Sequence, residues 1–182
     1  MKTNASACLK LYLKSKPFIK KFRNAVDVGC RDGDVSKPLA EDFENVYAFD
    51  YRDRMKFNNP KIHYYQCALG DVETKVKAFS GVIVDEREGV APMEVEQKVL
   101  DNYDFQDVDY IKIDVEGHEL KVLQGAVKTI ERFSPLMVVE ENGSAVFWKK
   151  GNQDEAIDFL KDMGYEIVAK TKQDYVMEKK DG

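Results

Sequence analysis

Short runs of β-branched, aromatic and other apolar residues constrain the fold of this chain more than any other feature. The sequence predicts five strands from such runs, at residues 25–28, 45–50, 62–67, 109–114 and 136–140. Most lack the strict polar–apolar alternation of a half-exposed strand, which is typical of strands covered on both faces. Segments with helical spacing separate them, so the sequence predicts an α/β fold built on a mostly parallel sheet.

Helices are predicted between these strands and near both ends of the chain. The predicted helices are 7–22 with a break at Pro17, one starting within 34–40, 117–133, and 154–163 closed by Gly164. Pro17 is expected to open a second short helix, because proline suits a first helical turn and not a helix interior. Residues 165–169 and 174–178 are predicted to form a C-terminal hairpin that adds an antiparallel edge to the sheet.

The composition fits one globular domain and argues against nucleic acid as a partner. The 182 residues include 33 acidic and 28 basic ones, which give a net charge of −5. A nucleic-acid-binding surface needs an excess of Lys and Arg. The basic run from Lys14 to Arg23 is the strongest exception, and it is predicted to be a solvated helix face.

Cysteine usage and hydropathy predict a cytoplasmic protein. Cys8, Cys30 and Cys67 are odd in number and scattered, which fits neither a disulfide framework nor a zinc site. A reducing compartment suits such cysteines. The first residues lack the long apolar stretch of a signal peptide, and no apolar run approaches the roughly 20 residues of a membrane-spanning helix. We therefore expect no membrane partner.

The residues that end the first two predicted strands indicate a nucleoside-containing cofactor. Gly29 and Gly33 follow the first strand and let the backbone turn tightly beside a ligand. Asp50 ends the second strand, where a carboxylate can accept two hydrogen bonds from a ribose diol. The GxxxG spacing lacks the GxGxxG that cradles a pyrophosphate, so it favours S-adenosylmethionine over NAD. An NAD-dependent oxidoreductase stays an alternative at this point.

A longer segment carries a specific family resemblance. Residues 110–126, YIKIDVEGHELKVLQGA, resemble the hallmark IKIDVEGxExxVLxGA of FkbM-family methyltransferases. Further pieces match in the same order: Asp27-Val28-Gly29 with Gly33, residues 46–50, 68–71 and 99–101, and Pro135 with Glu140. The resemblance covers about residues 26–141. It implies a Rossmann-like class I methyltransferase fold with a seven-stranded, mostly parallel sheet and a C-terminal antiparallel hairpin.

The resemblance also implies a function and a set of site residues. The implied reaction is S-adenosylmethionine-dependent methyl transfer, usually to a hydroxyl of a sugar or other small molecule, so we expect a small-molecule or glycan acceptor. Asp27 and Gly29 would flank the methionine part of the cofactor, Asp50 would hold the ribose, and Cys67 with Ala68 would lie beside the adenine. The full set of expected cofactor-binding residues is Asp27, Gly29, Cys30, Gly33, Asp50, Tyr51, Cys67, Ala68 and Asp114.

Three departures from the family pattern concern the substrate more than the cofactor. The family usually has Asn at the position of Arg31, inside the glycine loop, and Glu-Pro where this chain has Asp50-Tyr51. The chain is also short, so acceptor recognition is expected from residues 71–108 and the N-terminal helix. A cofactor-binding module without activity stays an alternative, which Arg31 favours and the intact aspartates disfavour.

Residues 71–108 are therefore expected to be an insertion on the acceptor side of a single domain over 1–182, with 1–24 as an N-terminal helical segment. Segments 75–79 and 93–99 alternate polar with apolar residues, as half-exposed strands do. The charged stretch 85–92 between them is predicted to be a mobile lid or an acceptor-binding loop. A plain exposed loop is the alternative.

The candidate catalytic groups follow the fourth strand. Asp114 or Glu116 is expected to be the general base that removes a proton from the acceptor, with His118 as a less favoured candidate. Both glutamates after this strand, Glu116 and Glu119, have a simpler explanation as acids stabilised in a first helical turn. A divalent cation held by Asp114, Glu116 and Glu140 is a further, less favoured possibility, so no metal is expected.

Other residues are assigned to the core or to the pocket wall. Lys112 lies between apolar neighbours on a central strand and is predicted to form a structural ion pair, because a buried ammonium group needs a carboxylate partner. Phe147 and Trp148 are predicted to be core residues or an apolar wall of the acceptor pocket. In the second case residues 140–142 would lie at its mouth.

Overall fold

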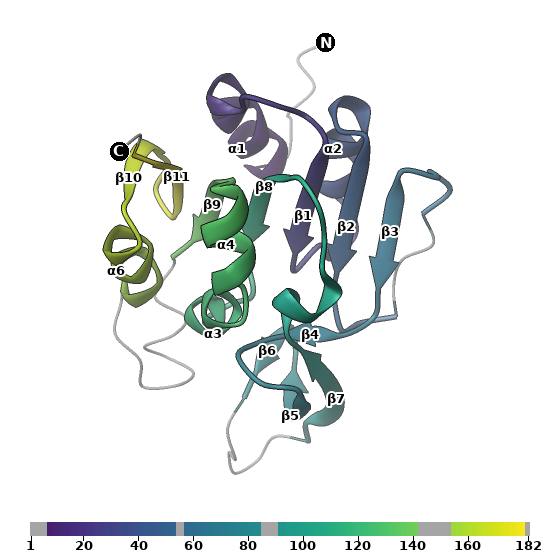
Figure 1. Cartoon of the computed structure of the whole chain (residues 1–182). Coiled ribbons are helices and arrows are strands. Elements are labelled where there is room, and N and C mark those ends of the chain that lie inside the picture. The colour runs from purple at the N-terminus through teal and green to yellow at the C-terminus, as the bar shows by residue number, and fades with distance from the viewer. Residues whose placement is uncertain (1–6, 54–56, 85–90, 142–153, 181–182) are drawn as a thin grey trace.

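The computed structural model describes residues 7–53, 57–84, 91–141 and 154–180, and its centre is a seven-stranded sheet (Figure 1). The strand order is β10-β11-β9-β8-β1-β2-β3. These strands are β1 (Asn24–Val28), β2 (Asn45–Phe49), β3 (Ile62–Tyr65), β8 (Val108–Ile113), β9 (Leu136–Glu140), β10 (Tyr165–Lys170) and β11 (Asp174–Lys179). All neighbouring pairs are parallel except those of β11 with β9 and β10. The predicted mostly parallel sheet with a C-terminal antiparallel hairpin is confirmed.

Helices cover both faces of this main sheet, as its apolar strands require. The helices are α1 (Ala7–Ser15), α2 (Ser36–Asp42), α3 (Glu119–Gln124), α4 (Val127–Phe133) and α6 (Glu155–Asp162), with single 3-10 turns η1 (Lys16–Phe18) and η2 (Leu100–Tyr103). Consecutive residues of β8 face opposite ways: Tyr110 packs in the cluster of α1 and α2, and Ile111 packs in the cluster of α3, α4 and α6. The central strands are therefore buried on both sides.

A second, four-stranded sheet lies beyond the carboxyl ends of β1 and β2, at the lower end of Figure 1. Its order is β4-β7-β5-β6, with β4 (Ala68–Leu69), β5 (Thr74–Phe79), β6 (Val82–Ile83) and β7 (Met93–Lys98). The half-exposed strands predicted at 75–79 and 93–99 are confirmed as β5 and β7. The strand predicted over 62–67 ends at Tyr65, because the chain leaves the main sheet there and pairs with β7.

The helix predicted over 117–133 is wrong in one respect, since it breaks into α3 and α4. A Cβ atom on Gly125 would lie 2.0 Å from the carbonyl oxygen of Gly70, so the two backbones touch at the break. Asp101 stabilises the restart by accepting hydrogen bonds from the N–H groups of Lys128 and Thr129, both at 2.9 Å. A carboxylate at a helix start satisfies N–H groups that have no partner within the helix.

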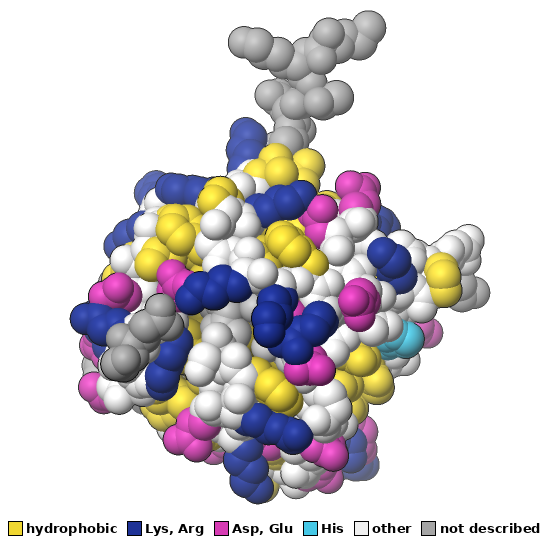
Figure 2. Space-filling model, turned by 45° about the horizontal axis from the view of Figure 1, so that its top comes forward, with side chains coloured by type: hydrophobic (Ala, Val, Ile, Leu, Met, Phe, Trp, Pro, Cys, Tyr) yellow, Lys and Arg dark blue, Asp and Glu magenta, His cyan; other side chains and the backbone are white. Residues whose placement is uncertain are grey.

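The basic run after α1 is also not the helix face that the sequence predicts. Only η1, which has Pro17 in its first turn, continues the helix, and Ile19 is already extended. Lys20, Lys21 and Arg23 therefore lie on a segment that enters β1. Figure 2 shows Lys and Arg side chains gathered on this end of the molecule, with acidic side chains among them.

None of the helices in the described part of the chain is long and apolar enough to cross a membrane.

Candidate functional site

The ends of β1, β2, β8 and β9 bring the predicted site residues to one edge of the main sheet. Both Gly29 and Cys30 donate their N–H groups to the carbonyl oxygen of Phe49, at 2.9 and 3.1 Å. The N–H of Asp114 donates to the carbonyl oxygen of Val28 at 3.1 Å. These bonds continue the strand pairing past the strand ends and hold the loops after β1, β2 and β8 side by side.

Gly29 is the point where two of these loops touch. Its φ is +78°, in the left-handed region that favours glycine. A Cβ atom there would lie 1.8 Å from the carbonyl oxygen of Asp114, which is far inside contact distance. The first glycine of the loop is therefore required for the close approach of β1 and β8.

A mostly apolar cavity, here called the nucleoside cavity, opens on one side of Gly29. It lies between the ends of β1 and β2, the second sheet and the loop before α3. The lining residues are Val28, Gly29, Phe49, Asp50, Tyr51, Cys67, Ala68, Leu69, Ile83, Val115 and His118. Its walls suit a flat aromatic group, and Asp50 supplies a carboxylate.

A charged cavity opens on the other side of Gly29, which lines both cavities. Its lining residues are Gly29, Cys30, Arg31, Asp32, Asp34, Val35, Lys112 and Asp114. Two cations and three carboxylates therefore face one small space. Such a lining suits a ligand that carries both a positive and a negative group.

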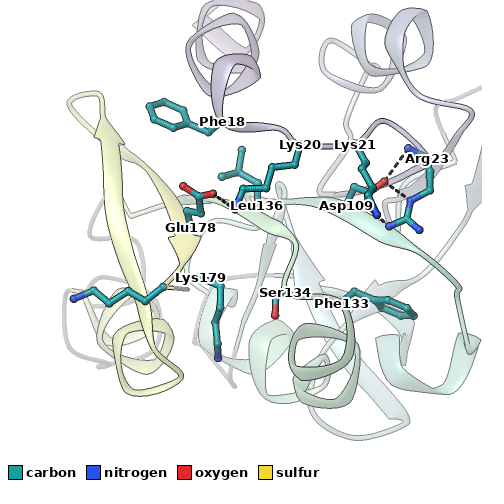
Figure 3. A pocket seen from close by; sticks show the side chains of 11 residues that line it. Phe18, Lys20, Lys21, Arg23, Asp109, Phe133, Ser134, Leu136, Glu178 and Lys179 are labelled. Carbon is teal, nitrogen blue, oxygen red and sulfur yellow. Dashed lines mark hydrogen bonds and ion pairs between the residues drawn. The ribbon is translucent and has the colours of Figure 1, made fainter. Parts of the chain in front are cut away.

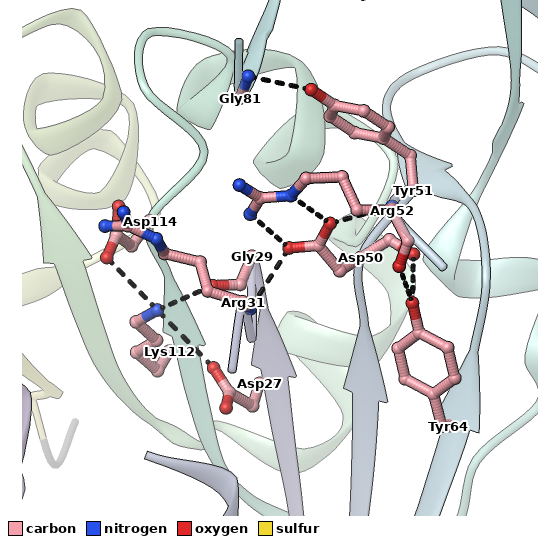
Figure 4. A network of polar contacts seen from close by, with 10 residues as sticks. All are labelled: Asp27, Gly29, Arg31, Asp50, Tyr51, Arg52, Tyr64, Gly81, Lys112 and Asp114. Atoms are coloured by element: carbon pink, nitrogen blue, oxygen red, sulfur yellow. Dashed lines mark hydrogen bonds and ion pairs between the residues drawn. The ribbon is translucent and has the colours of Figure 1, made fainter. Parts of the chain in front are cut away.

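The carboxylate of Asp50 is buried and accepts four hydrogen bonds (Figure 4). The donors are the backbone N–H groups of Arg31 at 3.0 Å and Arg52 at 2.9 Å, and the Arg52 guanidinium Nε at 2.9 Å and Nη2 at 2.7 Å. Burial alone would raise the pKa of this carboxyl, but the bonds from Arg52 outweigh it and hold the pKa below its usual value. Because a carboxylate accepts about four hydrogen bonds, a ribose diol has to compete with Arg52.

Tyr51 links this loop to the second sheet. Its hydroxyl oxygen accepts a hydrogen bond from the N–H of Gly81 at 2.8 Å, and its ring packs against the small core of that sheet. The residue after Asp50 therefore fixes the β5–β6 turn relative to the nucleoside cavity, which it also lines.

Lys112 forms the structural ion pair that the sequence predicts. Its side chain is 4% exposed, and its Nζ lies 3.5 Å from Asp27 Oδ1, 3.3 Å from Asp114 Oδ2 and 3.3 Å from the carbonyl oxygen of Gly29. Asp27 is fully buried, accepts a hydrogen bond from the Ser36 hydroxyl at 2.5 Å, and lines neither cavity. Asp27 thus lies behind Lys112, and its place beside the methionine moiety stays a prediction.

Three carboxylates converge after β8 and β9. One oxygen from each of Asp114, Glu116 and Glu140 lies within 4.8 Å of the others. Burial and the neighbouring charge of Asp114 raise the pKa of Glu140 well above its usual value. Burial also acts on Asp114, but the charge of Lys112 prevails and lowers its pKa. At neutral pH the pair therefore holds a proton on Glu140 and a negative charge on Asp114.

Glu119 shapes the loop that carries these groups. Its Oε1 accepts hydrogen bonds from the N–H groups of Val115 at 3.1 Å and Gly117 at 3.0 Å. Burial is the largest influence on its carboxyl and raises the pKa to about 7. Glu116, inside the clamped loop, has a left-handed φ of +56°. Glu119 is therefore a structural support of the site, which the helix-dipole interpretation alone did not predict.

His118 lies at the wall of the nucleoside cavity, away from the charged one. It is 7% exposed, and its Nε2 is 2.9 Å from the Oε1 of Gln97 on β7. It also borders an open groove between the second sheet and helices α3 and α6. Many of the residues that line this groove come from the segment 71–108.

Most of the predicted cofactor residues line one of the two cavities, and some do not. Gly29, Cys30, Asp50, Tyr51, Cys67, Ala68 and Asp114 are lining residues, whereas Asp27 and Gly33 are not. Sequence reasoning missed Arg52, whose position two residues after the expected ribose acid is its only signal. Residues 85–90 and 142–153, which include Asn142, Phe147 and Trp148, lie outside the described residues.

The opposite edge of the main sheet carries a groove, here called the amino-edge groove (Figure 3). It is lined by Phe18, Lys20, Lys21, Arg23, Asp109, Phe133, Ser134, Leu136, Glu178, Lys179 and Lys180. Lys20 lies 2.8 Å from Glu178, and Arg23 forms an ion pair with Asp109 at 2.6 Å. The basic run of the sequence thus contributes to this groove, where Lys20 and Arg23 are paired with carboxylates.

A family model described as "Methyltransferase FkbM domain" matches residues 27–167. None of the curated proteins matches the chain. A crystal structure of methyltransferase FkbM from Methylobacillus flagellatus KT superposes with a TM-score of 0.60 at 16% identity, over 92% of this chain and 46% of that one. Precorrin-6y C5,15-methyltransferase from Geobacter metallireducens GS-15 gives 0.52 at 12% identity, over 96% and 90%. The chain thus spans less than half of the FkbM structure, and both likenesses concern the fold.

Proposed function

Because the chain belongs to the FkbM methyltransferase family, we propose that it binds S-adenosylmethionine and transfers the methyl group to a hydroxyl oxygen of a small molecule or glycan. The observation that carries the proposal is the pair of cavities that meet at Gly29. One is apolar with a carboxylate, and the other is lined by charges of both signs. The expectation of a cytoplasmic protein is retained as part of this proposal.

The cofactor fits the lining of the two cavities part by part. An adenosine group suits the nucleoside cavity, where Asp50 is the one carboxylate beside apolar walls. The amino-acid part is a zwitterion and suits the charged cavity, where Arg31 and Lys112 face Asp32, Asp34 and Asp114. The diphosphate of NAD does not suit a space with three carboxylates, because like charges repel at such distances. The lining therefore favours S-adenosylmethionine over NAD.

The chain's own contribution to the reaction is positioning and proton transfer. When bound, the cofactor supplies an already activated methyl group. Asp114 ends the central strand β8 at the charged cavity, and Lys112 keeps its carboxylate ionised and fixed. We assign the proton-accepting role to the group of Asp114, Glu116 and Glu140, with Asp114 as the first residue to test. His118 stays a weaker candidate, because it borders the nucleoside cavity.

A divalent cation is a second way to use the same carboxylates. One oxygen each from Asp114, Glu116 and Glu140 lies close enough for a shared ion, and oxygen ligands suit Mg²⁺ or Ca²⁺. The ion would have to displace the proton on Glu140. Turnover in the presence of EDTA, with and without added Mg²⁺, decides between the two: retained activity in EDTA supports the metal-free proton transfer that we favour.

The proposed cofactor is tested by thermal unfolding with added ligands. S-adenosylhomocysteine should raise the melting temperature, because a ligand that binds the folded state stabilises it. NAD and NADH at the same concentration should not. A shift with NAD alone would show that the chain is an oxidoreductase and would end the methyltransferase proposal.

Activity is tested separately from binding, since a module without activity would also bind the cofactor. Acceptor candidates are screened with S-adenosylmethionine labelled in its methyl group, and transfer is followed by mass spectrometry. A labelled product that carries the methyl group on oxygen supports the proposal. Tight S-adenosylhomocysteine binding with no transfer across sugars, glycans and other hydroxyl compounds would favour the inactive module.

A further inference from the structure

We propose that the guanidinium group of Arg31 binds the α-carboxylate of the amino-acid part of S-adenosylmethionine. This inference rests on the proposed function and extends it to a residue that stands where the family usually has Asn. It explains the presence of Arg31 in the glycine loop by ligand recognition and not by loss of function. Three observations carry it: the backbone of Arg31, the free donors of its side chain, and its position in the charged cavity.

The backbone of Arg31 is in a conformation that its side chain does not favour. Its φ is +47°, in the left-handed region where non-glycine residues are uncommon and Asn is enriched. The surrounding loop imposes this geometry, because the N–H of Arg31 donates to Asp50 and the flanking Cys30 donates to Phe49. Strain of this kind gathers at ligand sites, so a side chain that tolerates it poorly points to a role for the guanidinium.

Arg31 is the one cation of the charged cavity whose side chain is not engaged by the protein. Within the described parts of the chain its guanidinium, which is exposed, makes no hydrogen bond or ion pair. Lys112, the other cation of the lining, is held by Asp27, Asp114 and the carbonyl of Gly29. The nearby Arg52 is held by Asp50. A ligand carboxylate in this cavity therefore finds its available donors on Arg31.

The side chain of Arg31 also runs in the right direction. Its backbone N–H is bonded to Asp50, at the nucleoside end, and Figure 4 shows its side chain extending toward Asp114, at the end of β8. Arg31 and Asp114 both line the charged cavity. The remaining carboxylates of the cavity, Asp32 and Asp34, are available for the ammonium group of the same zwitterion.

A carboxylate could also reach Arg31 from the acceptor, so the test separates the two sources. S-adenosylmethionine and its decarboxylated form differ only in the α-carboxylate and need no acceptor. Their affinities for the wild type and for Arg31→Asn, Arg31→Lys and Lys37→Ala are measured by calorimetry. Asn suits the left-handed backbone, so Arg31→Asn removes the guanidinium without adding strain. Lys37 is not a lining residue of the cavity, and its side chain donates to the backbone carbonyl of Asp32, so Lys37→Ala controls for the loss of one nearby charge.

Arg31→Asn should weaken S-adenosylmethionine binding by about 10- to 100-fold, the scale of a charge-assisted pair of hydrogen bonds. It should leave the decarboxylated form within about twofold of the wild type, and Lys37→Ala should leave both ligands within about twofold. Arg31→Lys should fall between wild type and Arg31→Asn, because an ammonium lacks the bidentate fork. An unchanged melting temperature of Arg31→Asn shows that the fold is intact.

Two results would overturn the inference while leaving the proposed function in place. Arg31→Asn could bind S-adenosylmethionine as tightly as the wild type, or it could lose affinity for both ligands equally. A raised KM for the acceptor with unchanged cofactor affinity would reassign Arg31 to the acceptor and also overturn it. Failure of the wild type to bind S-adenosylmethionine would instead remove the proposed function, and the inference with it.

Discussion

The two edges of the main sheet differ in how their charges are used. In the amino-edge groove the acidic residues Asp109 and Glu178 are paired with cations from the segment before β1. The carboxyl edge has two cavities that meet at Gly29. There, charges are buried, the backbone is left-handed at Arg31 and Glu116, and carboxyl pKa values are displaced in both directions.

The difference shows that charged side chains line a cavity for different reasons at the two edges of the sheet. Exposed ion pairs contribute little to stability and are easily solvated, so the amino-edge groove needs no ligand to explain its charges. Buried charges and strained residues are costly, and a fold keeps them where they serve a site. Each prediction below except the last therefore compares a residue at the carboxyl edge with a matched residue at the amino edge.

The largest difference in stability is expected between alanine variants of two glycines that have positive φ, Gly29 and Gly164. Gly29→Ala would place a Cβ atom 1.8 Å from a backbone carbonyl, whereas the nearest atoms at Gly164 belong to the flexible Lys179 side chain, at 3.6 Å. Gly29→Ala should lower the free energy of unfolding by at least about 3 kcal/mol, against about 1 kcal/mol for Gly164→Ala. Chemical denaturation measures both. Equal losses would mean that the contact between β1 and β8 is not tight.

The next comparison uses the two ends of β8. Asp114 follows the strand and Asp109 lies near its start, paired with Arg23. Asp114→Asn should reduce turnover by about 10²-fold or more, the scale of a lost general base, while S-adenosylhomocysteine affinity stays within a few-fold. Asp109→Asn should leave turnover within about twofold. Glu140→Gln is the next variant if Asp114→Asn turns over normally, and that result would place the base elsewhere in the cluster.

The third comparison concerns the pH dependence of stability. Burial raises the pKa of Glu119 to about 7 in the folded state, above its unfolded value, so the folded state retains a proton that the unfolded state has released. The free energy of unfolding should therefore fall as the pH rises from 5 to 8, by on the order of 2 kcal/mol from this group. The raised pKa of Glu140 acts in the same direction and adds to this fall. Asp50 and Asp114 have lowered pKa values, so the stability they contribute is already complete above about pH 5.

Glu119→Gln tests this assignment, because its side-chain oxygen can still accept the N–H bonds of Val115 and Gly117 without carrying a charge. Denaturation curves at pH 5 and pH 8 should show a smaller difference than in the wild type. Glu178→Gln, which removes a partly exposed carboxylate at the other edge, is the matched control. A full wild-type slope in Glu119→Gln would assign the pH dependence to another group.

The smallest predicted effect is a difference in cofactor affinity between alanine variants of Asp50 and of its neighbour Arg52. Asp50→Ala should weaken S-adenosylhomocysteine binding at least about tenfold, because it removes the expected acceptor of the ribose hydroxyls. Arg52→Ala should leave the affinity unchanged or raise it, because the ribose then has no competitor at Asp50. Calorimetry measures both. Loss of affinity in Arg52→Ala would show that the guanidinium holds Asp50 in place for the ligand.

The main sheet could be predicted from the sequence because its strands bury apolar side chains on both faces. Residues at the ends of these strands, such as Gly29, Asp50 and Asp114, were predicted correctly to converge on one edge, since the carboxyl ends of parallel strands do so. The break between α3 and α4 was not predicted. It depends on contact between Gly125 and Gly70, which are distant in the sequence.

Side-chain direction limited the prediction of the site itself. Asp27 lies inside β1, and its side chain points toward Ser36 at the start of α2 and not toward the edge. The hydrogen bonds from Arg52 to Asp50 depend on the path of the loop after β2, which composition does not specify. The second sheet was predicted as separate strands only, because the pairing of β4 with β7 joins segments that no local pattern connects.

A crystal structure of the protein with S-adenosylhomocysteine tests the central claim most directly. The account predicts density that spans Gly29, with the adenine between Tyr51 and Cys67-Ala68 and the α-carboxylate at Arg31. The amino-edge groove should be free of ligand. Density in that groove, or at the carboxyl edge with the amino-acid part turned toward the second sheet, would contradict the account.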